Sequence, residues 1–62
     1  PDLESTLRHY VDAHLSLAAT AAAMHMHKNT IIYRLRRIEV VAGVDLRDPR
    51  DLTRIVLALD AR

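Results

Sequence analysis

Apolar residues recur at intervals of three and four along most of the chain, which is the spacing that places them on one face of an α-helix. The first such run predicts a helix over about residues 2–14, for which Asp2 and Ser5 are alternative N-terminal caps. One face of this helix is expected to pack against the rest of the chain. The residues on that face are Leu3, Leu7, Tyr10, Val11 and His14.

A second, short helix is predicted over residues 17–24, because Ser16 is a good N-cap and the run that follows it is rich in alanine. Ala18, Ala21 and Ala22 are small enough to let another helix approach closely. We therefore expect a neighbouring helix to pack against this segment.

The clearest helical period belongs to a third segment, which ends at the only glycine of the chain, Gly43. A glycine directly after a helix is typical of a left-handed C-cap. The start is open between two residues: Asn29 is the better N-cap by its chemistry, whereas the spacing from the second helix favours His27. The apolar stripe expected to face the core consists of Ile31, Leu35, Ile38 and Ala42.

A fourth helix is predicted to begin after Asp48, with Pro49 at its first position and Asp51 in its first turn, and to run to Arg62. Its apolar face is formed by Leu52, Ile55, Val56 and Leu59. The predicted fold class is all-α. We expect a small bundle of about four helices with short connections, forming a single domain over residues 1–62.

The composition excludes several classes of protein. The chain has 62 residues, no cysteine and one glycine, which argues against a disulfide framework, a thiolate metal site and a glycine-rich phosphate loop. It has no apolar run near the roughly 18 residues that a membrane span needs, and no start that resembles a signal peptide. We therefore expect a cytoplasmic protein with no membrane partner.

The net charge of +1 hides a segregation of acidic and basic residues along the chain. Residues 13–38 contain no aspartate or glutamate, and Glu39 closes this stretch. Amide, phenol, hydroxyl and guanidinium groups gather on the third helix opposite its apolar stripe, which suits them to hold phosphates and to read base edges. A solvated helix face is the alternative. The basic side chains of the stretch are Lys28, Arg34, Arg36, Arg37, His14, His25 and His27.

The spacing of these segments fits a helix-turn-helix over about residues 16–42. The small residue Ala21 stands where the two helices touch, Met24 and Met26 flank the turn as core filler, and His25 occupies the turn position that usually holds glycine. In such a motif the second helix of the pair enters the major groove of DNA. The pattern thus predicts sequence-specific binding of double-stranded DNA by the third helix.

Three outward residues of the third helix, Asn29, Tyr33 and Arg36, are the candidates for base contacts. Each has an alternative role. Asn29 would instead cap the helix, the ring of Tyr33 would pack against the second helix, and Arg36 would hold a phosphate in place of a guanine edge.

Phosphate contacts are expected from residues near the start of the third helix and along its side, namely Lys28, Thr30, Arg37 and His27. Arg34 lies at the margin of the apolar stripe. Two roles are therefore open for it: a contact to DNA, and, at least as well supported, packing of its stem with an ion pair to an acid such as Glu39.

Other chemistry finds little support in the sequence. The histidines include His9, His14, His25 and His27, but the first two are five residues apart and point about 140° from each other on a helix. Ser5 and Ser16 lack a paired base. We expect no metal, no cofactor and no enzymatic activity.

The motif around the turn resembles a known family. Residues 27–39 read His-Lys-Asn-Thr-Ile-Ile-Tyr-Arg-Leu-Arg-Arg-Ile-Glu, and residues 43–49 read Gly-Val-Asp-Leu-Arg-Asp-Pro. With Leu17, Thr20 and Ala21 ahead of the turn, this pattern is similar to the C-terminal DNA-binding domain of PucR-type bacterial transcription regulators, which include regulators of purine catabolism and of sugar-diacid use. The resemblance runs from Leu7 to Leu59.

The resemblance implies a bacterial transcription regulator, expected to be an activator, whose sensory domain lies upstream of a C-terminal fragment. It also implies that a large residue is accepted at His25. The chain departs from the family at Val40 and Val41, where a polar or acidic residue is more often followed by leucine.

A helical protein-interaction or dimerisation module without DNA binding is the alternative function. Its surface would be formed by Val40, Val41 and Leu57. The two functions can coexist, because helix-turn-helix domains commonly act as two-fold dimers. We expect the intact regulator to be a homo-oligomer through its missing part.

Overall fold

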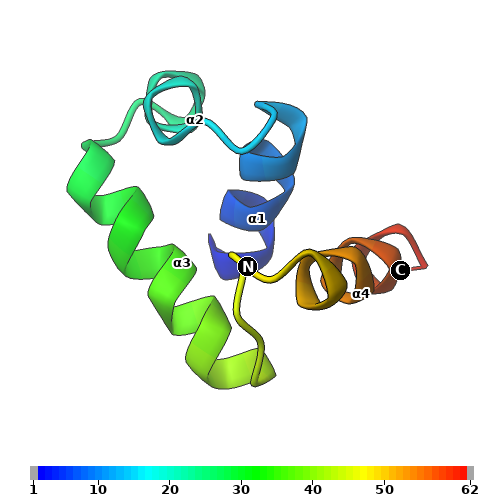
Figure 1. Cartoon of the computed structure of the whole chain (residues 1–62). Helices are drawn as coiled ribbons and strands as arrows, with labels where there is room; N and C mark the ends of the chain where they lie inside the picture. The colour runs from blue at the N-terminus through cyan, green and yellow to red at the C-terminus, as the bar shows by residue number, and fades with distance from the viewer. Residues whose placement is uncertain (1, 62) are drawn as a thin grey trace.

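The protein is all-α, as predicted. A computed structural model describes residues 2–61, and within that range it contains four helices and no strand. Figure 1 shows α1 lying between α3 on one side and α4 on the other, with α2 across one end. The helices are α1 (Asp2–Asp12), α2 (Leu17–Met24), α3 (Lys28–Ala42) and α4 (Pro49–Asp60). None of them is long and apolar enough to cross a membrane.

The first helix is shorter than the sequence predicts. It stops at Asp12, and His14 and Leu15 then adopt the left-handed conformation with φ of 56° and 65°. His14 is therefore exposed, and its expected place on the buried face of α1 is wrong. Ser5 lies inside the helix, so the alternative that it is the N-cap is wrong, whereas Asp2, the other predicted cap, is the first residue of α1.

The second helix begins as predicted. The Oγ of Ser16 accepts the N–H of Ala19 at 3.1 Å, which satisfies one of the free amide groups of the first turn. Ala21 is buried where α1 and α3 approach, but Ala18 and Ala22 are exposed. Only one of the three small residues thus allows a close helix approach.

The core lies where α1, α2 and α3 meet. Ile31 is completely buried, and the hydroxyls of the buried residues Thr6 and Thr20 donate to backbone carbonyls one turn earlier, at 2.7 and 2.6 Å. Ala42 is exposed, so the predicted stripe of α3 ends one turn earlier than expected. The buried apolar residues are Leu7, Ala21, Ile31, Leu35, Ile38 and Leu59.

The fourth helix starts with the predicted cap. The Oδ1 of Asp48 accepts the N–H of Arg50 at 2.9 Å, and Pro49 occupies the first turn. Of the predicted apolar face only Leu59 is buried, whereas Leu52, Ile55 and Val56 are half-buried. The helix ends at Asp60, and the predicted end at Arg62 lies outside the described residues.

Candidate nucleic-acid interface

The turn between α2 and α3 is closed by backbone hydrogen bonds around His25. This residue has φ of 55° and ψ of 43°, and its N–H donates to the carbonyl of Ala22 at 3.3 Å, while the N–H of Met26 donates to the carbonyl of Ala21 at 3.0 Å. The prediction that His25 lies in the turn is confirmed, and the residue adopts the left-handed conformation that a glycine would take most easily. Because His25 has a side chain, this conformation costs about 1 kcal/mol that a glycine would not lose.

The start of α3 is capped by His27. Its ring Nδ1 accepts the N–H of Asn29 at 3.0 Å, and its backbone is extended, with φ of −68° and ψ of 145°. The alternative that Asn29 caps the helix is therefore wrong. Asn29 lies in the first turn with an exposed side chain, which leaves its amide group available to an outside partner.

The outer face of α3 is open to solvent because Ile31, Leu35 and Ile38 hold the opposite face in the core. The side chain of Tyr33 is 65% exposed, so its ring does not pack under α2 as the alternative required. Thr30 is half-buried. The other predicted contact residues of this helix and its cap, all exposed, are His27, Lys28, Asn29, Arg36 and Arg37.

Arg34 belongs to the core margin. Its Nη1 donates to the Oγ1 of Thr6 on α1 at 3.3 Å. Glu39, the partner expected for it, instead accepts the N–H of Leu46 at 2.8 Å. The predicted Arg34–Glu39 pair is wrong, because the guanidinium of Arg34 points toward α1, where it makes the interhelical hydrogen bond to Thr6.

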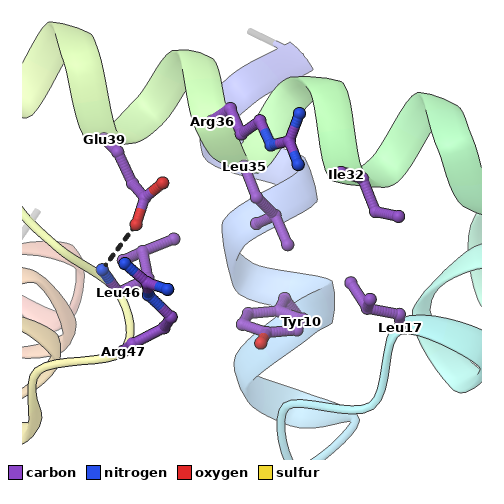
Figure 2. A pocket seen from close by; sticks show the side chains of 8 residues that line it. All are labelled: Tyr10, Leu17, Ile32, Leu35, Arg36, Glu39, Leu46 and Arg47. Carbon is purple, nitrogen blue, oxygen red and sulfur yellow. Dashed lines mark hydrogen bonds between the residues drawn. The ribbon is translucent and has the colours of Figure 1, made fainter.

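A hollow of about 410 Å³ opens beside α3, on the side that carries Arg36 (Figure 2). Its floor is apolar, with the ring of Tyr10 and the side chain of Leu35 at its centre. It joins α1, the start of α2, α3 and the α3–α4 loop. The residues that line it are Tyr10, Leu17, Ile32, Leu35, Arg36, Glu39, Leu46 and Arg47.

The α3–α4 loop was not assigned a functional role by the sequence. It leaves α3 through Gly43, whose φ of 67° confirms the predicted left-handed cap. The loop is then held by carboxylates: Asp51 Oδ2 accepts the N–H of Asp45 at 2.9 Å, and Asp45 Oδ1 accepts the N–H of Arg47 at 2.9 Å. The second of these bonds lowers the pKa of the Asp45 carboxyl, and the side chain of Arg47 lowers it further. Several acids close behind a single glycine are the signal that points to such a loop.

No metal centre is built by the residues between positions 2 and 61. In that range no three histidine, cysteine, aspartate or glutamate side chains gather in a way that could hold a metal ion.

The comparison with protein families agrees with this arrangement of helices. Residues 3–61 match the family described as the PucR C-terminal helix-turn-helix domain. The chain belongs to this family. The match covers α1 almost from its start and all of α2, α3 and α4. Helix-turn-helix domains of PucR-type regulators indicate DNA-binding transcription regulation.

Curated relatives of this PucR-family chain come from several bacteria. The purine catabolism regulatory protein of Bacillus subtilis is 41% identical over 54 residues, which are 87% of this chain and 10% of that protein. An uncharacterized protein in the pkwA 5′ region of Thermomonospora curvata is 42% identical over 57 residues, 92% of this chain and 32% of the relative. An uncharacterized protein of Mycobacterium tuberculosis is 41% identical over 51 residues, 82% of this chain and 12% of the relative.

The chain thus spans a third or less of the length of these relatives. No solved structure gives a significant match.

Proposed function

We propose that this PucR-family chain binds double-stranded DNA sequence-specifically, with α3 in the major groove, as the DNA-binding part of a bacterial transcription regulator. The observation that carries the proposal is the exposed outer face of α3, on which an amide, a phenol and two guanidinium groups lie opposite a buried apolar stripe. An α-helix with its side chains is about as wide as the major groove. The domain acts by binding alone, without catalysis.

Base recognition is assigned to Asn29, Tyr33 and Arg36. An asparagine amide can pair with the N6 and N7 edge of adenine, and an arginine guanidinium can pair with O6 and N7 of guanine. Asn29 is free for this role because His27 caps the helix in its place. Tyr33 lies one turn after Asn29, and its exposed phenol can both donate and accept a hydrogen bond.

Phosphate binding is assigned to Lys28, Thr30, Arg37 and His27. Lys28 and His27 are exposed at the start of α3, where the positive end of the helix dipole adds to their attraction for a phosphate. Arg37 is exposed about one turn beyond Tyr33. These contacts would set the position of α3 on the duplex, and the base contacts would select the sequence.

The regulator itself is proposed to act in the cytoplasm as a transcription activator and homo-oligomer, with a sensory domain upstream of this DNA-binding domain over residues 1–62. The length of the relatives, of which this chain matches a third or less, supports a further domain in the intact regulator. Two-fold oligomers would also raise the affinity of a domain with few basic contacts by using two half-sites.

A helical dimerisation module without DNA binding is the second candidate function. Exposed apolar side chains favour it: Val40, Val41 and Leu57 are 77%, 68% and 62% exposed. Such a module would associate in a concentration-dependent way and show no salt-dependent affinity for duplex DNA.

The test is a pair of arginine variants in the intact protein, Arg36→Ala and Arg37→Ala, titrated against a set of duplexes selected in vitro. Arg36→Ala is expected to weaken binding by about 1–3 kcal/mol and to relax specificity at one base pair. Arg37→Ala is expected to weaken all sequences alike and to lower the salt slope by about one. If wild-type protein associates with itself but binds no duplex, the dimerisation module is the correct function.

A further inference from the structure

The α3–α4 loop places a second arginine beside the proposed recognition helix. Arg47 and Arg36 line the same hollow, Arg36 from α3 and Arg47 from the loop (Figure 2). The side chain of Arg47 is 91% exposed. The guanidinium of Arg47 therefore lies beside α3, although Arg47 is outside the helix-turn-helix in the sequence.

The backbone that carries Arg47 is fixed by its neighbours. The N–H of Leu46 donates to Glu39 Oε2 at 2.8 Å, and the N–H of Asp45 donates to Asp51 Oδ2 at 2.9 Å. The N–H of Arg47 itself donates to Asp45 Oδ1 at 2.9 Å. Carboxylates from α3, the loop and α4 thus accept three successive backbone amides. The backbone position of Arg47 is therefore fixed before any ligand binds.

The guanidinium of Arg47 keeps most of its donors. Its Nε donates to Asp45 Oδ1 at 3.3 Å, which orients the group, while neither of its two terminal nitrogens makes a hydrogen bond within residues 2–61. These nitrogens present four N–H groups, enough for a forked contact to an anionic oxygen pair. Glu39 also lines the hollow, but one of its oxygens already accepts the amide of Leu46.

A helix that fills the major groove has a phosphate backbone on each flank. Thr30 and Arg37 are seven residues apart and share one flank of α3, whereas Ile32 and Arg36 share the other. On that second flank the proposed phosphate contacts include only Lys28, at the first turn of the helix. The hollow with Arg47 on its rim lies further along this flank.

We propose that Arg47 binds a DNA backbone phosphate on the Arg36 flank of α3, as a contact outside the helix-turn-helix. This inference rests on the proposed function, because it requires α3 to lie in the groove. Arg47 then positions the domain without reading sequence, and it complements Arg37 on the opposite strand.

The experiment measures DNA binding by the intact protein at several salt concentrations. Arg47→Gln, which removes the charge, is expected to weaken binding about five- to tenfold for every duplex and to lower the salt slope by about 0.9. Arg47→Lys is expected to keep that slope. Arg54→Gln is the matched control, because Arg54 is also an exposed arginine but lies on α4, and the backbone of α4 does not approach α3 within the described residues.

The outcomes separate this inference from the function on which it rests. Wild-type protein without salt-dependent affinity for duplex DNA would contradict the proposed function. Wild-type binding together with an Arg47→Gln variant of unchanged affinity and salt slope would overturn the role of Arg47 alone. Loss of discrimination between duplexes, in place of a uniform loss, would also overturn it, because a phosphate contact carries no sequence information.

Discussion

α3 and α4 are both amphipathic helices with a clear apolar stripe, yet they are held to the molecule in different ways. α3 packs against α1 and α2, and three of its apolar side chains are buried. The backbone of α4 approaches only α1 among the described helices, and α4 buries one residue, Leu59. A periodic pattern therefore shows which face of a helix turns inward, but the number of neighbouring helices decides how much of that face is covered.

The incomplete packing of α4 also leaves a groove beside this helix. A groove of about 190 Å³ runs between α1, the end of α3 and α4, and Ile55 and Val41 lie along it. A polar contact strengthens the docking of α4: the Nη2 of Arg8 on α1 donates to the carbonyl of Leu59 at 3.1 Å. We expect the unit of α1, α2 and α3 to contribute most of the free energy of folding. The least stable helix of the domain should be α4.

The largest effect is expected from truncating the same residue type in both regions. Ile31→Ala removes a fully buried side chain at the centre of the three-helix unit and should lower the free energy of unfolding by about 3–4 kcal/mol. Ile55→Ala, at a half-buried site on α4, should lower it by about 1 kcal/mol. Urea denaturation followed by circular dichroism measures both. Equal losses would contradict the difference between the two regions.

A smaller effect is expected at the link between α1 and α4. Arg8→Met keeps an apolar stem but removes the hydrogen bond to the carbonyl of Leu59, which should weaken the docking of α4 by about 1 kcal/mol. Amide hydrogen exchange should speed up in α4 and stay unchanged in α3. Arg54→Met is the control, and a similar acceleration there would show that the hydrogen bond is not the cause.

The left-handed conformation of His25 in the turn of the helix-turn-helix lowers the stability of the folded state, and a substitution can remove this loss. His25→Gly should raise the free energy of unfolding by about 0.5–1 kcal/mol, because glycine adopts the left-handed conformation of this residue without steric conflict. Ala22→Gly, inside α2, should do the opposite by about 1 kcal/mol. Thermal unfolding of the two variants gives the comparison, and a destabilised His25→Gly protein would mean that the imidazole has a stabilising contact.

The smallest effect concerns the loop that joins the two regions. The N–H and side chain of Arg47 hold the pKa of Asp45 below its usual value of 3.8. The stabilisation that this carboxylate adds is thus complete above that value and is lost as the pH falls through the lower pKa of the folded state. The stability difference between wild type and Asp45→Asn should shrink on acidification. A difference that does not change with pH would argue against an ionised Asp45 in the loop.

Features set by neighbouring residues were predictable from the sequence. Ser16, Gly43 and Asp48 each have a side chain or backbone property suited to a helix end, and the structure confirms all three positions. His25 was placed correctly because the spacing of the helix pair requires a turn there.

Features that depend on distant contacts were not predictable. The end of α1 is not predictable from residue type, because Leu15 shares the left-handed conformation with His14 although leucine rarely adopts a positive φ. The partner of Arg34 is Thr6, 28 residues away, and only the packing of α1 on α3 brings the two together. Arg47 drew no prediction because its place beside α3 depends on how the loop folds back. The base and phosphate contacts assigned to α3 stay predictions.

The cap at the start of α3 has a chemical consequence for His27. A ring nitrogen that accepts the N–H of Asn29 has no proton of its own, so the neutral imidazole carries its proton on Nε2. The ring is thereby fixed in one tautomer, with one N–H left to donate. The same side chain can therefore stabilise the helix through Nδ1 and donate from Nε2 to an acceptor outside the protein.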